Sequence, residues 1–439
     1  MSLDKWKSFA PPPRKVVSPD KWNVFLSYRS INRTWVLNLY DVLRQHDYQV
    51  FLDQCVLKPG DELILELQDA LKNSQAGILI WSSKTGESDW VLREYQSMER
   101  RVDTKPGFVF VPLALDDSEL PDFAANRIYV NFSSYPDGPN GGELLRLLYA
   151  LVEQPLSPEA ARFANQQDVA SKSAINKINA AIDIGDPEYL VELFEGGFNE
   201  EGDLAWKTSS ALGCKAVEGL IELGQKEKAM ELLGKLRQQF PNAIRPKQLH
   251  ALTLARAGDV MKAQRILAEL YAEGERDPET LGIYGRTWMD RYQKSKDINH
   301  LIKSRDLYAE AFEGAKDDYY TGINAAAKSV LVGEPEDIAK AAKYAERVEQ
   351  IVGTEPHPGD YWKTATVGET FLIQKKYEDA ARLYKDAVAI APAKTDSHLT
   401  TWTQACRLME KLQPADEQRA AIRAVFKSLP DCEAILNEQ

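Results

Sequence analysis

Near residue 155 the sequence passes from one hydrophobic pattern to another, and this change decides which folds the chain can adopt. Before it, short apolar runs alternate with segments whose apolar residues recur at helical spacing. After it, the strand-like runs disappear and segments with helical spacing follow one another in pairs. The sequence therefore predicts an α/β domain followed by an all-α solenoid.

The first pattern predicts a flavodoxin-like parallel sheet. The expected strands cover residues 23–28, 48–53, 76–82, 108–115 and 127–132, and the expected helices cover residues 34–45, 62–73, 90–102 and 142–152. Strands that are apolar almost from end to end are typical of a parallel sheet covered on both faces. Such sheets bind ligands in the loops that follow their strands, so we expect a site in the loops 28–33, 53–61 and 82–89.

The second pattern contains a repeat. Three positions recur after 34 residues: Gly224 with Gly258, Ala229 with Ala263, and Leu233 with Leu267. A helix–turn–helix unit of this length is typical of tetratricopeptide repeats, in which small residues let helices cross closely. We expect about six helix pairs between residues 204 and 429, and an irregular helical bundle is the alternative.

These patterns divide the chain into four parts. We expect a disordered lead over residues 1–20, the α/β domain over 21–155, a linker with lead-in helices over 156–200, and the helical array over 201–439. The lead is polar, rich in proline and without an apolar stretch, so it does not have the pattern of a secretory signal.

The composition excludes several classes of protein. Of the 439 residues, 44% are hydrophobic and 27% are charged, which suits a folded chain with a sizeable core. The formal net charge is −12 and both parts of the chain are acidic, so we expect no nucleic-acid partner. No run of apolar residues is long enough to span a membrane.

The four cysteines, Cys55, Cys214, Cys406 and Cys432, lie far apart and without metal-binding spacing. We expect them to be free thiols in a reducing compartment. The five histidines are scattered as well. The sequence therefore predicts a cytoplasmic protein with no metal site and no cofactor.

The chain lacks the motifs of several large enzyme classes. It contains no GxxxxGK[ST], no GxGxxG after the first strand, no HExxH and no GxSxG. What it does contain is Trp90 and Glu94, an indole and a carboxylate that share one helix face at positions i and i+4. A carboxylate beside an aromatic wall can stabilise an oxocarbenium-like centre in glycosidic chemistry. The alternative is a buried anchor and a solvated charge on an ordinary surface helix.

Three segments of the α/β part resemble Toll/interleukin-1 receptor (TIR) domains: NVFLSYRS at 23–30, FLDQCVLKPGDEL at 51–63 and SDWVLREY at 88–95. The resemblance covers about 130 residues and implies that residues 53–61 form the BB loop of that family. It is strongest to TIR domains that cleave NAD, including bacterial TIR effectors. The resemblance therefore implies a bacterial protein of immune or antiphage defence.

The same resemblance assigns site residues. It implies that Glu94 is the catalytic glutamate, and that the other contacts to substrate come from Tyr28, Arg29, Ser30, Asp53, Leu57 and Trp90. Among these, Tyr28, Arg29 and Ser30 would line the nicotinamide and ribose side, although any strand-end loop can be polar. Asp53 and Leu57 would shape the BB-loop wall, although Asp53 could instead cap its own loop. Trp90 would pack against the dinucleotide, and its alternative is a structural indole.

The helical part resembles the TRAFs-binding central region of stress-activated kinase kinase kinases. The strings that carry the resemblance are YYTGINAA at 319–326 and DYWKTAT at 360–366, with Tyr284-Gly285-Arg286 before them. Helix packing is the alternative role for these aromatic residues. His357 and His398 are expected to be surface or hydrogen-bonded side chains and not ligands.

Two functions remain open. The first is a TIR-type NAD+ glycohydrolase that releases nicotinamide with ADP-ribose or a cyclic isomer, is activated by self-association and is regulated by the array. The second is a non-catalytic TIR scaffold whose array recruits partner proteins. Both predict contact between TIR domains of different copies and a possible protein partner on the concave surface of the array.

Overall fold

The computed structural model describes residues 3–29, 32–52, 63–83, 89–120, 129–196, 209–315, 317–392 and 394–437. For residues 3–5, 63–66 and 89–95 it describes the backbone only. The chain forms two compact units, Met1–Glu275 and Arg276–Gln439. Their boundary lies inside the helical part and not at residue 155, where the sequence pattern changes.

The first unit contains a five-stranded sheet in the order β2-β1-β3-β4-β5, and all neighbouring strands are parallel. The strands are β1 (Trp22–Ser27), β2 (Val50–Phe51), β3 (Ser74–Trp81), β4 (Val109–Ala114) and β5 (Val130–Asn131). The predicted doubly covered parallel sheet is confirmed. β1 has β2 as its neighbour on one side and β3 on the other. The chain therefore adds strands first on one side of β1 and then on the other, so the strand order reverses between β1 and β3.

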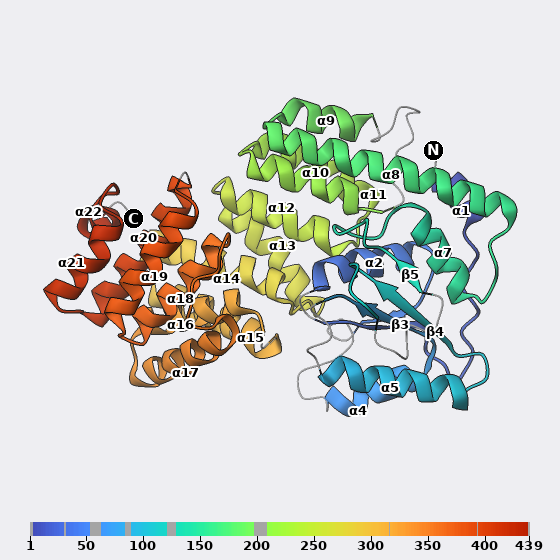
Figure 1. Cartoon of the computed structure of the whole chain (residues 1–439), viewed down its shortest axis with the longest axis horizontal. Helices are drawn as coiled ribbons and strands as arrows, with labels where there is room; N and C mark the ends of the chain where they lie inside the picture. Colours follow the sequence, from blue (N-terminus) through green and yellow to red (C-terminus); the bar gives the residue numbers. More distant parts are fainter. Residues whose placement is uncertain are drawn as a thin grey trace. The chain divides into compact units, whose positions relative to one another are not determined.

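Helices cover both faces of this sheet (Figure 1). They are α2 (Arg33–Gln45) and α7 (Gly141–Leu151) on one face, and α4 (Leu63–Lys72) and α5 (Asp89–Thr104) on the other. Successive strand residues point to opposite faces. In β3, Ile78 joins the core beneath α2 and α7, whereas Leu79 joins the core beneath α4 and α5. Burial on both faces explains why the strands are apolar along their whole length.

The start of the chain differs from the expected disordered lead. Leu3–Phe9 forms helix α1, in which Trp6 is only 2% exposed, and Phe9 stacks on Phe163 with 4.4 Å between ring centroids. Further along, Arg14 donates to the carbonyl oxygens of Gly107 and Gln75. Two aromatic side chains one helical turn apart give even a polar segment an apolar face.

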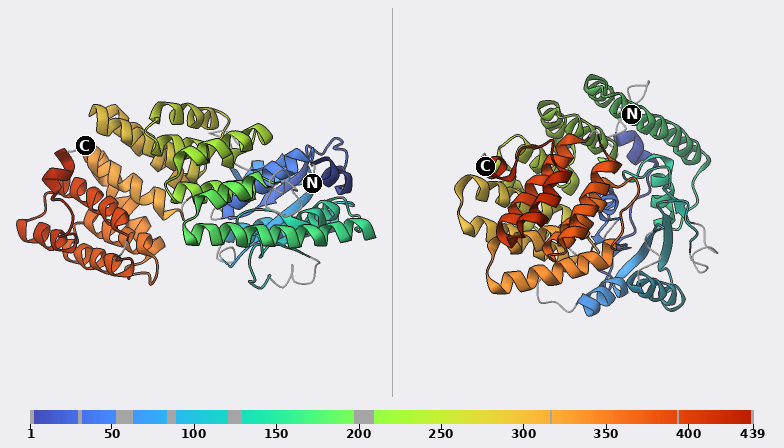
Figure 2. Two further views of the ribbon diagram at one scale, coloured as in Figure 1. Left: turned by 90° about the horizontal axis from the view of Figure 1, so that it is seen from above. Right: turned by 60° about the vertical axis from the view of Figure 1, so that its left-hand side comes forward.

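The remaining helices of the first unit continue the core of the sheet. They are α8 (Pro158–Ile184), α9 (Pro187–Glu195), α10 (Ala211–Glu222), α11 (Lys226–Gln239), α12 (Ile244–Arg256) and α13 (Val260–Ala272). The buried side chains of α2 and α7 form one continuous cluster with those of α8 to α13. In Figure 2, α8 is the long green helix beside the sheet. Its Asp168 accepts from the backbone N–H of Gly142 at 2.7 Å and so binds the N-terminus of α7.

The second unit consists of helix pairs. Its helices are α14 (Pro278–Ser295), α15 (Ile298–Gly314), α16 (Tyr319–Val332), α17 (Pro335–Val352), α18 (Tyr361–Ile373), α19 (Tyr377–Ile390), α20 (Thr395–Leu412), α21 (Asp416–Val425) and α22 (Cys432–Asn437). With α10–α13, the helices α14–α21 make six pairs within the described residues, as predicted, and α22 follows them. The 34-residue period holds between α11 and α13, and later pairs have longer repeats.

One expectation about the cysteines is wrong. Cys406 of α20 and Cys432 of α22 form a disulfide across 26 positions of sequence. The two residues have no recognisable spacing, and only the fold brings their helices together. Cys214 is a free, buried thiol.

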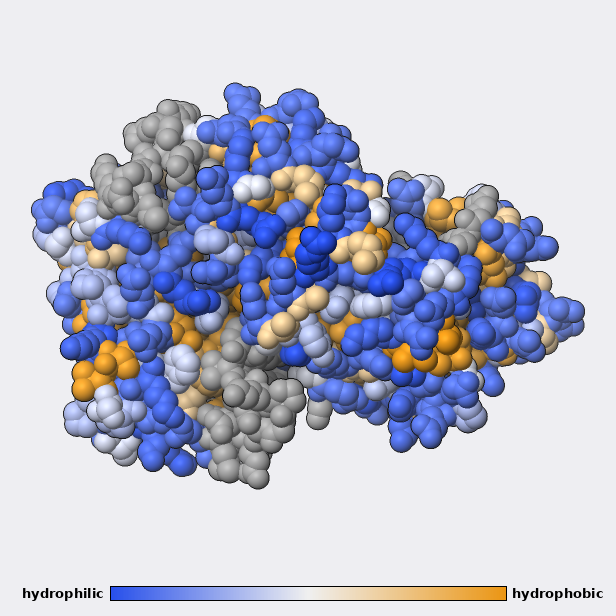
Figure 3. Space-filling model, turned by 180° about the vertical axis from the view of Figure 1, so that it is seen from behind, coloured by the Kyte–Doolittle hydropathy of each residue, from blue (hydrophilic) through white to orange (hydrophobic). Residues whose placement is uncertain are grey.

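The visible face of the molecule in Figure 3 is mostly hydrophilic, with hydrophobic residues in small separate groups. The most exposed large hydrophobic residues, Val169 and Ile184, lie on α8. Among the described residues, no helix is both long and apolar enough to cross a membrane.

Candidate active site

The carboxyl ends of the strands place polar segments at one edge of the sheet. Tyr28 and Arg29 follow β1, Ser82 and Ser83 follow β3, and Asp116 follows β4 shortly after its last residue. β1 and β3 are neighbours with Ser27 paired to Leu79, so their loops diverge from adjacent points. In parallel sheets this reversal of strand order opens a crevice that binds ligands.

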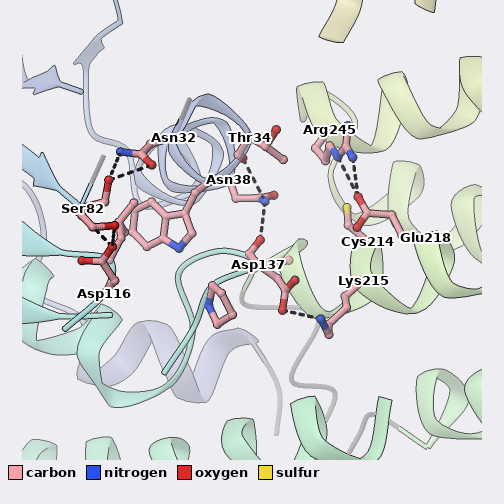
Figure 4. Close-up of a pocket in the computed structure, with 15 residues that line it drawn as sticks. Asn32, Thr34, Asn38, Ser82, Asp116, Asp137, Cys214, Lys215, Glu218 and Arg245 are labelled. Atoms are coloured by element: carbon pink, nitrogen blue, oxygen red, sulfur yellow. Dashed lines mark hydrogen bonds and ion pairs between the residues drawn. The ribbon is translucent and has the colours of Figure 1, made fainter. Parts of the chain in front are cut away.

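A cavity of about 330 Å³ lies at this edge (Figure 4). Its lining comes from the strand-end loops, from α2, and from two helices of the array, α10 and α12. The lining residues are Asn32, Thr34, Trp35, Asn38, Ser82, Ser83, Leu115, Asp116, Pro136, Asp137, Ala211, Cys214, Lys215, Glu218 and Arg245. The helical array therefore forms one wall of the cavity, opposite the sheet.

The sheet side of the cavity is a hydrogen-bonded group of small polar residues. Asn32 Nδ2 donates to Ser82 Oγ at 3.1 Å, which joins the loops after β1 and β3. The carboxylate of Asp116 accepts from the N–H and the hydroxyl of Ser83 at 2.8 and 2.7 Å. Burial alone would raise the pKa of Asp116, but hydrogen bonds from Ser118 and Ser83 hold it below its usual value. Asp116 therefore stays ionised and fixes the loop after β3.

The array side carries charges that are paired with each other or with the sheet side. Lys215 Nζ lies 2.8 Å from Asp137 Oδ2, and Arg245 donates from Nη2 and Nε to Glu218 Oε1 at 2.6 and 3.0 Å. Cys214, which precedes Lys215 in α10, also lines the cavity, and burial raises the pKa of its thiol far above the usual value. A thiol that stays protonated is a poor nucleophile, so Cys214 is a packing residue.

The structure places some of the predicted site residues. Tyr28 and Arg29 are half-buried at the end of β1, and Arg33 Nη1 donates to the phenol oxygen of Tyr28. Trp90 and Glu94 lie in the first two turns of α5, where only the backbone is described. Ser30, Asp53 and Leu57 lie outside the described residues. Helix α5 follows β3 in the chain, and β3 is the neighbour of β1 in the sheet. Tyr28 and Arg29 lie at the end of β1.

Sequence reasoning missed most of the residues that line the cavity. Asn32, Ser82 and Ser83 lie in loops that the strand pattern had already indicated. Lys215 and Arg245 gave no signal, because nothing in a helical repeat tells which of its exposed cations will face another domain. Among the described residues, no three His, Cys, Asp or Glu side chains are grouped so that they could hold a metal ion.

Comparison with known proteins identifies both parts of the chain. Residues 24–147 match the family model described as TIR domain, and residues 225–329 match the model described as Tetratricopeptide Repeats-Sensor. A probable 2′ cyclic ADP-D-ribose synthase of Brachypodium distachyon is 31% identical over 110 residues, which are 23% of this chain and 49% of that protein. The chain thus spans about half the length of the curated relative that it matches.

Solved structures that are similar to this chain include yeast Tom70 and a thermophilic TPR protein. Yeast Tom70 is 12% identical, with a TM-score of 0.40 over 96% of this chain and 72% of its own. A thermophilic TPR protein of Thermus thermophilus is 15% identical, with a TM-score of 0.36 over 44% of this chain and 96% of its own. From the two family matches, the chain contains a TIR domain followed by a tetratricopeptide-like sensor array.

Proposed function

We propose that this chain cleaves the bond between nicotinamide and ribose in NAD+. The observation that carries the proposal is the TIR match over residues 24–147, together with the 31% identity to a probable 2′ cyclic ADP-D-ribose synthase. The sheet supports it, because the segment with Trp90 and Glu94 follows β3 at the point where the strand order reverses.

The proposed reaction needs little covalent help from the protein. The bond from the anomeric carbon to the pyridinium nitrogen breaks, and its electron pair leaves with neutral nicotinamide. The protein has to orient the ribose and stabilise the positive charge that develops on its anomeric carbon. A water molecule then captures the carbon and loses a proton to give ADP-ribose, or a nucleophile of the same molecule captures it to give a cyclic isomer. NAD+ is the substrate, and the proposed reaction uses no metal and no further cofactor.

The roles of the residues follow the family resemblance. Glu94 would stabilise the charged ribose, and the surrounding contacts would come from Tyr28, Arg29, Ser30, Asp53, Leu57 and Trp90. The polar groups of Asn32 and Ser82 add to this edge of the sheet.

The test is nicotinamide release from NAD+ by the purified chain and by Glu94→Gln. Losing one group that stabilises the transition state typically lowers the rate by about 10²–10³-fold. Glu99→Gln, further along α5, is the matched control and should retain the wild-type rate. A folded Glu94→Gln variant with full activity would remove Glu94 from the reaction. Chromatography of the products separates linear from cyclic ADP-ribose, and turnover should persist in EDTA.

Activation by self-association is part of the proposal. The resemblance to TIR domains implies that the BB loop, here residues 53–61, completes the cleft of a neighbouring copy. The array would control how the copies cluster. The specific rate should therefore rise with protein concentration. A demonstrably monomeric sample that turns over at the full rate would contradict this part.

The second candidate function is a scaffold in which the TIR domain only self-associates and the array recruits proteins. The paired helices of the array favour it, because such repeats present an extended surface to partners. Its distinguishing result is a chain that clusters, yet releases no nicotinamide at any concentration.

For cellular context we propose action on the cytoplasmic NAD+ pool in immune or antiphage defence, on the basis of the TIR resemblance. The Cys406–Cys432 disulfide is the feature that favours an oxidising compartment instead. Thiol trapping of these two cysteines in intact cells decides between the two locations.

A further inference from the structure

A buried ion pair connects the TIR domain to the last residue of the first unit. Arg33 begins α2, and its Nη2 lies 3.0 Å from Oε2 of Glu275, which is 242 positions away in sequence. Both side chains are only 5% exposed. Removing either partner would leave an unpaired charge away from water, which is costly in free energy.

The same arginine contacts a residue of the proposed site. Arg33 Nη1 donates to the phenol oxygen of Tyr28, which follows β1 at the carboxyl edge of the sheet. The guanidinium group is planar and rigid, so its two ends cannot move independently. One side chain therefore connects Glu275 with the phenol of Tyr28.

Glu275 is itself fixed to the array. The backbone N–H of Glu275 donates to the carbonyl of Leu270 at 3.0 Å, and that of Gly274 donates to the carbonyl of Tyr271 at 3.3 Å. With Gly274 at a φ of 98°, these two bonds form the Schellman motif that ends α13. Glu275 is thus attached rigidly to α13, and Arg276 after it begins the second unit.

We propose that Arg33 and Glu275 are positioning residues for Tyr28, so that the end of α13 sets the geometry of the loop after β1. This inference rests on the proposed NAD+ cleavage, for which Tyr28 is a substrate contact. It assigns the array a direct part in the site: a displacement of α13 moves Glu275, and the arginine carries that displacement to the phenol. The array would then regulate binding of the nicotinamide–ribose portion as well as clustering.

The test is a double-mutant cycle in the full-length chain with Glu275→Gln and Tyr28→Phe. If Glu275 acts through the phenol, Glu275→Gln should raise KM for NAD+ several-fold at nearly constant kcat. In the Tyr28→Phe background the same change should have no further effect on KM, because the group that it positions is gone. Equal effects of Glu275→Gln in both backgrounds would overturn the proposal.

A matched control comes from the same helix end. Glu273 pairs with Lys247 at 3.0 Å but is more than half exposed, so Glu273→Gln removes a paired carboxylate two positions away. It should leave KM and kcat at their wild-type values. If Glu273→Gln shifted KM as much as Glu275→Gln, the effect would belong to α13 in general and the proposal would fail.

A readout without turnover separates this inference from the proposed function. With 3-fluorotyrosine at position 28, the ¹⁹F resonance should shift in Glu275→Gln and remain in place in Glu273→Gln. If no variant cleaves NAD+ but the resonance shifts, the NAD+ reaction is wrong and the linkage stands. If the resonance does not respond to Glu275→Gln, the linkage is wrong whatever the activity.

Discussion

At the scale of single residues, the least expected group is a carboxyl inside the core. Asp41 of α2 is only 6% exposed, and its Oδ2 accepts from the backbone N–H of Ile244 at 3.2 Å. Ile244 is the first residue of α12, and the N-cap of that helix, Ala243, has no side chain that can cap it. Asp41 thus caps a helix of the array from the TIR domain.

Burial raises the pKa of Asp41 to about 8, although the hydrogen bond from Ile244 and the charge of Arg44 oppose the change. The folded chain therefore keeps a proton that the unfolded chain loses near pH 4. Between these values the folded state binds more protons, so the stability contributed by Asp41 is complete below about pH 4 and falls as pH rises to about 8.

We predict that Asp41→Asn removes this pH dependence, because an amide keeps the acceptor for Ile244 and cannot ionise. The difference in unfolding free energy between Asp41→Asn and the wild type should change in favour of the variant by about 2–4 kcal/mol from pH 5 to pH 8. The measurement is urea unfolding of the full chain at both pH values. Asp183→Asn, on the exposed face of α8, is the control that should track the wild type. A constant difference between Asp41→Asn and the wild type would show that Asp41 is ionised throughout.

Prediction from sequence succeeds at this scale only where the relevant residues are close in the chain. The pairing of Trp90 and Glu94 depends on helical spacing alone, so the motif can be found without a structure. The pairs Arg33–Glu275 and Asp41–Ile244 join positions more than 200 residues apart. No local pattern distinguishes these side chains from ordinary solvated charges.

At the scale of elements, glycine lets the helices of a pair approach closely. In α14 a Cβ on Gly285 would lie 2.9 Å from the ring of Tyr308 in α15, and in α18 one on Gly368 would lie 2.9 Å from the ring of Tyr384 in α19. Both tyrosines are at most 2% exposed and cannot move into solvent. This gives the string around Tyr284-Gly285 a packing role, one of the alternatives that the sequence left open.

We predict opposite outcomes for two Gly→Ala changes in α14 and α15. Gly285→Ala should destabilise the second unit by about 1–3 kcal/mol, because the added methyl group forces a buried ring to move. Gly314→Ala has open space within 4 Å and should be neutral or stabilise by at most about 1 kcal/mol through helix propensity. Hydrogen exchange of the amides of α14 and α15 in the full chain measures both effects. A stabilising Gly285→Ala would mean that the pair is packed more loosely than the structure has it.

The elements themselves were largely predictable, and the exceptions have physical causes. β3 covers residues 74–81, close to the expected 76–82. It was predictable because a strand buried on both faces is apolar along its length. β2 is shorter than expected, only Val50–Phe51, because it lies at the edge of the sheet and pairs with β1 alone. Helix α1 was not expected, because its burial depends on Phe163 of α8 and not on its own composition.

At the scale of the whole molecule, helices α8 to α13 belong with the TIR domain. The buried residues of α2 and α7 continue without a break into those of α8 to α13. The polar contacts agree, since Lys215, Ile244 and Glu275 all reach residues of the TIR domain. A TIR domain cut from its array near residue 155 would therefore expose apolar surface that the intact chain buries.

We therefore predict that the fragment 1–275 is the smallest well-folded piece that carries the TIR domain. It should be monodisperse when dilute and unfold cooperatively, whereas the fragment 1–155 should aggregate, because it exposes the faces of α2 and α7 at once. If the cavity wall from α10 and α12 supports NAD+ binding, the fragment 1–275 should also keep a basal rate of nicotinamide release. Regulation by the array would be altered in that fragment, since the second unit is missing.

Light scattering coupled to size exclusion, with turnover measured on the same fractions, tests this expectation. The contradicting outcome is a fragment 1–155 that is soluble, folds cooperatively and releases nicotinamide at the same rate as the fragment 1–275. The TIR domain would then not need the core that it shares with α8 to α13.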